Sequence, residues 1–335
     1  MTILQALVFP YHFVINYFWS LKILLSELIS PITVVNLSEY DIDLINVQKD
    51  IAQSYKDYAW DNYLLQQDKI KVIQADISAE QFKKPPSHIW IDLYQDKIKD
   101  SEISTVFPQI SVGCLELIQS QRATRQRCVS EFTLERNGRQ WHINRIASQP
   151  FVQTEALIAS NDALDYRLTP RTFKELPDHL FDDNLKGKLR AVAEQTCEHR
   201  PSTQRLSIVV HHTVVWCDAK QAGSNSPEGI HQDGMDFIVS ALCIERRNVQ
   251  GGRSIVYGAD KATPIFAMEL QPGQGIFQPD ARTSLWHEVT PISVKNLPCP
   301  VIAPLSALMS WFWHEFKKIP AFYIIASQLR YCQMR

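Results

Sequence analysis

The sequence lacks both a strong net charge and any run of basic residues. Its 335 residues contain 34 Lys and Arg against 36 Asp and Glu, so the formal net charge is −2. Proteins that bind nucleic acid or acidic membranes through bulk electrostatics carry an excess of positive charge. The sequence therefore predicts no nucleic-acid partner. Its one dense basic group, Arg122, Arg125 and Arg127, is expected to be solvated or paired, with one arginine facing an anionic substrate group as the alternative.

The sequence also lacks any Cys-x-x-Cys pair, and its cysteines number seven. An odd count without paired spacing argues against a disulfide framework and against a zinc site. Cys217 and Cys243 lie in or beside apolar runs, so we expect both to be buried thiols. Free cysteines are typical of a reducing compartment, which predicts a cytoplasmic location.

Residues 1–21 lack Asp, Glu, Lys and Arg altogether. A transmembrane helix needs about 20 mainly apolar residues, but Pro10, His12 and Asn16 interrupt this stretch. A secretory signal has basic residues before its apolar core and small residues at a cleavage site after it, and neither is evident. For residues 1–36 we favour a packed or loosely docked helix. A membrane-associating segment and a misassigned start codon are the alternatives.

Changes in composition divide the chain into three expected parts. Residues 1–84 form an N-terminal extension, with helical spacing of apolar residues over 40–63 and a linker at residues 83–87. Residues 85–292 form the main domain. Residues 293–335 form an atypical C-terminal tail, where Pro298, Pro300 and Pro304 disfavour a central strand and residues 307–316 indicate an apolar helix.

Short strands dominate the expected main domain. Residues 128–134 and 140–146 alternate in polarity around Asn137-Gly138, which is a strong hairpin signal. Residues 177–200 have helical periodicity, although Gly187 lies within them. Apolar runs separated by turn residues then follow at 205–216, 237–245, 254–257, 264–270, 275–278 and 285–291. Such spacing favours an antiparallel barrel or sandwich, and we predict a mainly β jelly roll with flanking helices.

His231, Asp233 and His287 are the candidate metal ligands. Residues i and i+2 of an extended strand point to the same side, so His231 and Asp233 can reach one ion while Gln232 faces away. His287 would come from a later strand folded back beside the first. Two imidazoles and one carboxylate on one face of an ion are typical of non-haem Fe(II) oxygenases. The spacing alone also fits two surface polar residues and an unrelated histidine.

The surrounding motifs resemble a known family. They are Ser226-Pro-Glu-Gly-Ile-His-Gln-Asp-Gly234, Arg247-Asn248 with Gly251-Gly252, and His287-Glu-Val-Thr-Pro-Ile292. They are similar to the bacterial 2-oxoglutarate/Fe(II)-dependent dioxygenases that include free L-isoleucine and related amino-acid hydroxylases. The resemblance implies a cupin-like double-stranded β-helix, iron on His231, Asp233 and His287, and 2-oxoglutarate and O₂ as co-substrates. It also implies hydroxylation of a free aliphatic L-amino acid, with no catalytic residue beyond the metal ligands.

The sequence departs from this family after His287. Members carry a basic residue, usually Arg, that binds the far carboxylate of 2-oxoglutarate, but this chain has no Arg between Arg282 and Arg330. Three explanations stay open. The final core strand is lost, Lys295 or another basic residue replaces the anchor, or the protein keeps the metal without this co-substrate. A degenerate, non-catalytic protein that binds a metal or ligand, and a cupin-like dioxygenase without a co-substrate, are therefore the alternative functions.

Three further residues are candidates for contact with a small-molecule substrate. Gln232, Arg247 and Asn248 are possible substrate-binding residues, although Arg247 and Asn248 fit a role in shaping the following turn equally well. His211 and His212 are adjacent on an expected strand, so at most one of them can face the pocket.

Overall fold

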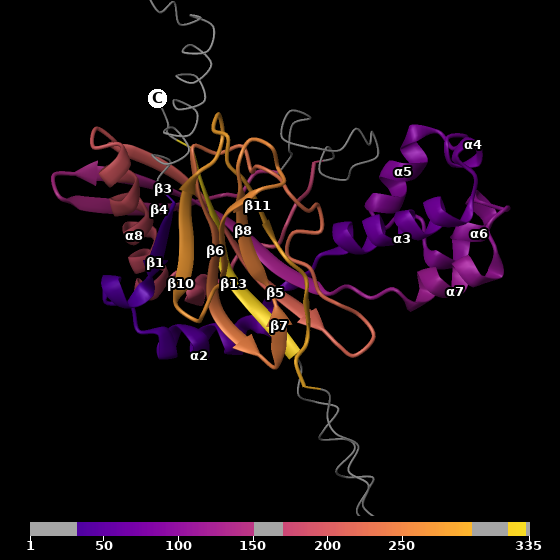
Figure 1. Ribbon diagram of the computed structural model, residues 1–335, viewed down its shortest axis with the longest axis horizontal. Helices are drawn as coiled ribbons and strands as arrows, with labels where there is room; N and C mark the ends of the chain where they lie inside the picture. The colour runs from indigo at the N-terminus through magenta and orange to yellow at the C-terminus, as the bar shows by residue number, and fades with distance from the viewer. Residues whose placement is uncertain (1–31, 151–169, 297–320, 333–335) are drawn as a thin grey trace, which may run out of the picture.

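The computed structural model describes residues 32–150, 170–296 and 321–332, and an antiparallel sheet of eight strands forms its centre (Figure 1). The strand order is β1 (Thr33–Asn36), β10 (Gln274–Pro279), β6 (Phe237–Arg247), β13 (Ala321–Cys332), β5 (Arg205–Cys217), β3 (Arg125–Asn137) and β2 (Ala59–Trp60), with β4 (Gln140–Ile146) paired to β3. Most neighbours in this sheet are distant in sequence, as in a jelly roll.

Two smaller sheets form the second layer. One contains β11 (Trp286–Val289), β8 (Arg253–Tyr257) and β9 (Pro264–Glu269), and the other pairs β12 (Ile292–Val294) with β7 (Val249–Gly251). A single apolar cluster joins the layers, with Val215, Ala241, Cys243 and Ile276 from the large sheet and Val249, Val289 and Ile292 from the small ones. The described strands form open sheets, not a closed barrel. The predicted mainly β, double-stranded β-helix core with flanking helices is confirmed.

Strand β13 was not expected from the sequence. It lies between β5 and β6 and pairs antiparallel with both, so that Ile324 stands opposite Val214 and Glu245. A strand therefore occupies the central position that loss of the final core strand would have left empty. The run Phe322-Tyr-Ile-Ile325 is a local strand signal, but its partners lie far upstream, so no local pattern identifies β5 and β6 as its neighbours. The helix expected over residues 307–316 lies outside the described residues.

Helices cover the other face of the large sheet. α2 (Leu44–Ser54) and α8 (Asp183–His199) bury their apolar residues against β3, β5 and β6 in one cluster. The Asp182 side chain caps α8 by accepting a hydrogen bond from the Leu185 N–H at 2.8 Å. Gly187 brings α8 close to the N-terminal segment, because an added Cβ would lie 3.3 Å from Ile42 Cγ1. The predicted helix over 177–200 is confirmed from Asp183 onward.

A separate helical lobe lies to the right in Figure 1. It contains α3 (Asn62–Asp76), α4 (Ala79–Phe82), α5 (Ser87–Tyr94), α6 (Ile103–Val106) and α7 (Val112–Ser120). It has its own apolar cluster, in which the Trp90 ring lies 4.5 Å from that of Phe82 and 5.2 Å from that of Phe107. The expected linker at residues 83–87 is therefore a short loop inside this lobe, and the proposed boundary at residues 84 and 85 falls within it.

Other local predictions have mixed outcomes. The β3–β4 hairpin is confirmed, with Asn137 opposite Gln140 and Gly138 at φ +63°. The helix expected over 40–63 is instead divided into α2, two short 3₁₀ helices η1 (Leu37–Tyr40) and η2 (Tyr55–Asp57), and β2. Further 3₁₀ helices are η3 (Asp100–Glu102) and η6 (Asp178–Leu180).

Two further predictions concern the burial of the cysteines and the presence of a membrane-spanning helix. Cys243 is buried as expected, whereas Cys217 at the end of β5 is only half-buried, and neither forms a disulfide bond within the described residues. Within the described ranges, no helix combines the length and apolar character needed to cross a membrane. Residues 1–31, for which a membrane-associating segment was an alternative, lie outside those ranges.

Candidate metal centre

The side chains of His231, Asp233 and His287 converge on one point. His231 and His287 pair through their backbones, each N–H donating to the other's carbonyl oxygen at 3.0 Å. Asp233 Oδ1 lies 3.7 Å from His231 Nε2, and Asp233 Oδ2 lies 3.5 Å from His287 Nε2. One potential ligand atom from each residue lies within 4.8 Å of the other two. The structure thus brings together the three residues that the sequence singled out.

The turn before His231 sets the orientation of its imidazole. The Gly229 N–H donates to the Ser226 carbonyl oxygen at 3.0 Å, and Gly229 has φ +71°, which glycine adopts without strain. His231 Nδ1 lies 2.8 Å from the Gly229 carbonyl oxygen, so Nδ1 donates and Nε2 is left with its lone pair. Within the described part of the chain, no group hydrogen-bonds to His231 Nε2.

This donor set fits a divalent first-row metal ion. His231, Asp233 and His287 are each at most 2% exposed. Burial, and then the neighbouring His287, lowers the pKa of His231, which keeps the imidazole neutral as metal binding requires. Neighbouring donor atoms of an octahedral ion, each about 2.1 Å from it, lie about 3 Å apart. The separations of 3.5 and 3.7 Å therefore need only a small contraction around an ion.

Asp280, which sequence analysis missed, is a buried carboxylate beside this point. Its Oδ2 accepts hydrogen bonds from the N–H groups of Gly234 and Met235 at 2.6 and 3.1 Å. Its Oδ1 lies 3.8 Å from His287 Nδ1. Burial, and then the charge of Asp233, raises the pKa of Asp280. The sequence signal is only that Asp280 shares the inward-facing alternation of Ile276 on β10.

Glu228 is a second carboxylate that sequence analysis missed. Its Oε1 lies 3.5 Å from His231 Nε2, the nitrogen that faces the candidate metal position, and its side chain is 10% exposed. The residue belongs to the Ser226-Pro-Glu-Gly229 turn, so the same turn that orients His231 also places this carboxylate. The candidate centre therefore has a further negative charge at its edge.

Gln232 points away from the three ligands. Its Nε2 donates to the carbonyl oxygens of Asp280, Thr283 and Leu285 at 3.2, 3.2 and 2.7 Å. The amide therefore holds the segment that leads from β10 to His287. This agrees with the expected alternation along the strand and leaves the Gln232 amide engaged with backbone.

Arg247, Asn248 and Lys295 lie together at the other end of the molecule. Asn248 has φ +50° and exchanges two hydrogen bonds of 3.1 Å with the backbone of Asn296. Lys295 is exposed, and its N–H donates to the Asn248 carbonyl oxygen at 2.9 Å. Arg247 ends the 11-residue strand β6, whose first residue lies near Asp233. That strand is about 33 Å long, so the structure does not bring these residues to the candidate centre.

The basic residues of β3 are buried and paired. Arg125 and Arg127 lie 2.9 and 3.0 Å from Asp61 Oδ2. Burial alone would raise the pKa of Asp61, but Arg127 and Arg125 lower it to about 2. Arg125 Nη1 also donates to the Asn225 carbonyl oxygen at 2.5 Å, which links β3 to the loop before His231. The predicted pairing is confirmed for these two arginines.

His212 faces the helices. Its Nδ1 lies 3.0 Å from the Tyr58 hydroxyl oxygen, and burial lowers its pKa well below the ordinary value. His211, one residue earlier on β5, faces the opposite way, as the sequence predicted.

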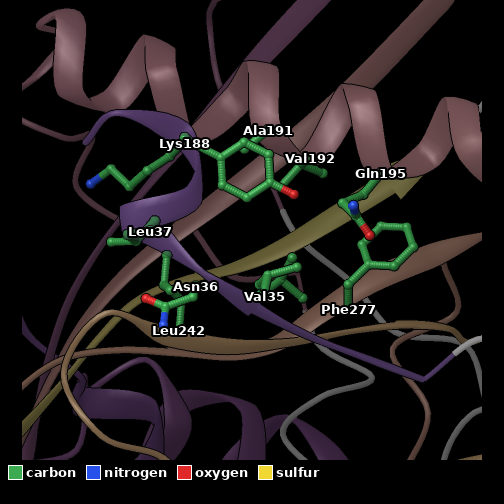
Figure 2. A pocket seen from close by; sticks show the side chains of 11 residues that line it. Val35, Asn36, Leu37, Lys188, Ala191, Val192, Gln195, Leu242 and Phe277 are labelled. Atoms are coloured by element: carbon green, nitrogen blue, oxygen red, sulfur yellow. The ribbon is translucent and has the colours of Figure 1, made fainter.

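Figure 2 shows a cavity on the helix-covered face, lined by residues that include Lys188, Val192 and Phe277. Its volume of about 20 Å³ has room for about one water molecule. A larger open cleft of about 410 Å³ lies beside the turn before His231 and is lined partly by Asp68, Ser226 and Glu288. Of the residues that line this cleft, none is a candidate metal ligand.

Comparison with known proteins places the chain in a family. Residues 116–297 match the family model described as 2OG-Fe dioxygenase. No curated protein sequence matches the chain. Three solved structures are similar to it. A bsmA homolog from Methylobium petroleophilum PM1 has 19% identity and a TM-score of 0.46, and the match covers 64% of this chain and 74% of that chain. IDO from Bacillus thuringiensis has 12% identity and a TM-score of 0.45, with coverage of 81% and 100%, and the Fe(II)/(alpha)ketoglutarate-dependent dioxygenase TqaL has 11% identity and a TM-score of 0.38, with coverage of 80% and 89%. The matched region spans more than half of the sequence, and the chain therefore belongs to the 2OG-Fe dioxygenase family, whose cofactors are Fe(II), 2-oxoglutarate and O₂.

Proposed function

We propose that this protein hydroxylates a free aliphatic L-amino acid, with Fe(II) held by His231, Asp233 and His287. Family membership supports an Fe(II)- and 2-oxoglutarate-dependent oxygenase. The observation that carries the proposed ligand set is the convergence of the three side chains, with Nε2 of both histidines facing the Asp233 carboxylate. The amino-acid substrate rests on the sequence motifs around these residues.

The protein's part in the reaction is to hold and shield the reactants. Bound iron supplies the chemistry that activates O₂ and hydroxylates a C–H bond, so no protein acid or base is required. Two neutral imidazoles and one carboxylate leave a divalent ion with a net positive charge, which favours binding of an anionic co-substrate. Burial of His231, Asp233 and His287 excludes water from the protein side of the ion.

Glu228 supports an amino-acid substrate. A free L-amino acid carries an α-ammonium group, and a carboxylate is the matching partner for it. Glu228 Oε1 lies 3.5 Å from His231 Nε2, so an ammonium bound there would hold the substrate beside the metal position. We propose Glu228 for this role. The described cysteines form no disulfide bond, which agrees with the proposed cytoplasmic location.

The test is anaerobic titration with Fe(II), with and without 2-oxoglutarate, followed by the visible metal-to-ligand charge-transfer band. We expect the band in the wild type and its loss in Asp233→Ala, because that variant lacks the only carboxylate of the ligand set. Asp236→Ala is the matched control, since Asp236 pairs with Arg200 and Arg282 instead. An unchanged band and unchanged turnover in Asp233→Ala would refute the ligand assignment. Consumption of 2-oxoglutarate with a panel of aliphatic amino acids then tests the substrate.

A degenerate metal-binding protein is the second candidate. It is favoured by the absence of Arg from residues 283 to 329 and by the exposed position of Lys295, far from His287. It predicts that Fe(II) binds in the same titration but that no charge-transfer band develops when 2-oxoglutarate is added. A band in the wild type would exclude it.

A further inference from the structure

We propose that Asp280 is a positioning residue for the metal centre. In this role its carboxylate orients the His287 imidazole and at the same time fixes the backbone that follows Asp233. The inference rests on the proposed ligand set. Asp280 follows the last residue of β10, and its side chain is fully buried. It touches both halves of the centre, which come from segments about fifty residues apart in the sequence.

One oxygen of Asp280 holds the segment after Asp233. Oδ2 accepts hydrogen bonds from the N–H groups of Gly234 and Met235, at 2.6 and 3.1 Å. Gly234 has φ +85°, so the chain turns sharply at this residue. Hydrogen bonds to a carboxylate are shorter and stronger than those between neutral groups. The two hydrogen bonds to Asp280 Oδ2 therefore fix the backbone turn that follows Asp233.

The other oxygen faces His287. Oδ1 lies 3.8 Å from His287 Nδ1, while Nε2 of the same ring lies 3.5 Å from Asp233 Oδ2. With the metal on Nε2, the proton of the ring resides on Nδ1 and points toward Asp280. At 3.8 Å the pair is not hydrogen-bonded in the structure, and the proposal is that it becomes so when the metal binds. A carboxylate in this position fixes the tautomer of a histidine ligand and raises its basicity.

The two histidines differ in their partners. His231 Nδ1 donates to a neutral backbone carbonyl, that of Gly229, at 2.8 Å. His287 Nδ1 faces a charged carboxylate. We therefore infer that His287 is the stronger electron donor of the two ligands, and that its orientation depends on one side chain.

The backbone of Asp280 belongs to the same assembly. Its carbonyl oxygen accepts hydrogen bonds from Gln232 Nε2 and Thr283 Oγ1, and its N–H donates to the Asp236 carbonyl oxygen at 3.2 Å. In the described part of the chain, the Asp280 carboxylate has no Lys or Arg partner, and the His287 imidazole, which is neutral as a metal ligand, lies 3.8 Å from it. Burying a carboxylate without a cation is unfavourable. A divalent ion on His287 would offset that cost, which explains why such a group lies here.

The test uses the full chain loaded with Co(II), observed by proton NMR in water. Each histidine bound through Nε2 gives one exchangeable, hyperfine-shifted Nδ1–H resonance, so the wild type should show two. In Asp280→Asn the side chain has one oxygen, which accepts, and one NH₂ group, which donates. Either the NH₂ group faces the His287 N–H, so that two donors meet, or it faces the N–H groups of Gly234 and Met235, from which it cannot accept. We expect one resonance, that of His287, to shift or to broaden through faster exchange with water. We also expect Co(II) affinity to fall by about 10- to 100-fold.

Asp236→Asn is the control, because this nearby carboxylate pairs with Arg200 and Arg282 and not with a candidate ligand, and its replacement should leave both resonances unchanged. Two unshifted resonances and unchanged affinity in Asp280→Asn would overturn the role of Asp280 while the metal centre stands. No hyperfine-shifted resonance in the wild type would overturn the centre and this inference together.

A measurement on the wild type covers the case in which Asp280→Asn does not fold. In the Zn(II)-loaded protein, a carboxylate-bonded imidazole N–H resonates downfield of a carbonyl-bonded one. The His287 Nδ1–H is therefore expected downfield of the His231 Nδ1–H. Equal shifts for the two protons would contradict the proposal.

Discussion

At the scale of single residues, Gln232 lies between the candidate ligands His231 and Asp233, and its amide supports the backbone that leads to His287. Gln232→Ala should lower the free energy of unfolding by about 1–3 kcal/mol, because it leaves buried carbonyl groups without their donor. It should also weaken metal binding, since the segment leading to His287 loses its contact with the Gln232 amide. Chemical denaturation and Fe(II) titration measure both effects.

Gln250→Ala is the matched control for this variant. Gln250 is exposed on β7 and its amide donates to the Ser293 hydroxyl at 3.1 Å, so its removal should change little. A Gln232→Ala variant with unchanged stability but a raised KM for the substrate would show that Gln232 binds substrate instead.

The relative orientation of His231, Gln232 and Asp233 could be predicted from the sequence because the i, i+2 alternation of an extended segment is local. His287 could be predicted only through the family resemblance of the surrounding motifs, since its pairing with His231 is not local. Asp280 could not. Asp280 lies near His287 because the end of β10 lies beside β11, which belongs to a different sheet. Local residue spacing does not predict which strands of different sheets lie side by side. The sequence does not single out Glu228 within the Ser226–Gly234 motif, because the turn at Gly229 decides which way its side chain faces.

At the scale of the helices and strands, α8 carries a buried lysine. Lys188 is 4% exposed, and burial lowers its pKa to about 8 despite the opposing effect of Asp182. Its folded pKa is thus below the value of 10.5 expected when unfolded. The unfolded state therefore binds more protons between about pH 8 and 10.5, and stability rises with pH over this range.

Replacement of this lysine by methionine should stabilise the protein. Each pKa unit corresponds to about 1.4 kcal/mol, so Lys188→Met should raise the free energy of unfolding by about 3 kcal/mol at pH 7. The gain should shrink as the pH rises toward 10.5. Urea denaturation at several pH values measures it, with Arg190→Met on the exposed face of α8 as control. A gain that is constant with pH would show that packing, not charge, is responsible.

Elements with local signals were predicted well. The β3–β4 hairpin has Asn-Gly at its turn, and α8 has both a capping aspartate and apolar periodicity. The sequence instead predicts a linker at residues 83–87, because two adjacent prolines are typical of linkers and the packing around them cannot be read from the sequence. In the structure the rings of Phe82 and Trp90, from either side of these prolines, lie 4.5 Å apart.

At the scale of the whole molecule, the apolar interior is divided between the β-helix and the lobe. The lobe cluster and the two clusters of the β-helix have no buried residue in common. Trp90 is 3% exposed at the centre of the lobe cluster. Trp90→Ala should destabilise the lobe by about 3–5 kcal/mol through loss of this packing, and leave metal affinity unchanged.

Far-UV circular dichroism during heating, together with Fe(II) titration, tests this separation. Trp60→Ala is the control, because Trp60 is 48% exposed on β2. A parallel loss of metal affinity in Trp90→Ala would show that the lobe supports the centre directly.

The position of β13 has a consequence for how the protein is made. The ribosome synthesises β5 and β6 long before β13, which later inserts between them. Until then each of these strands emerges with one edge unpaired, and exposed edges invite pairing with other chains. β6 begins just after Asp233, so the segment bearing two candidate ligands is anchored to a sheet that is completed late. We therefore expect the sheet that carries this segment to be complete only after β13 has been translated.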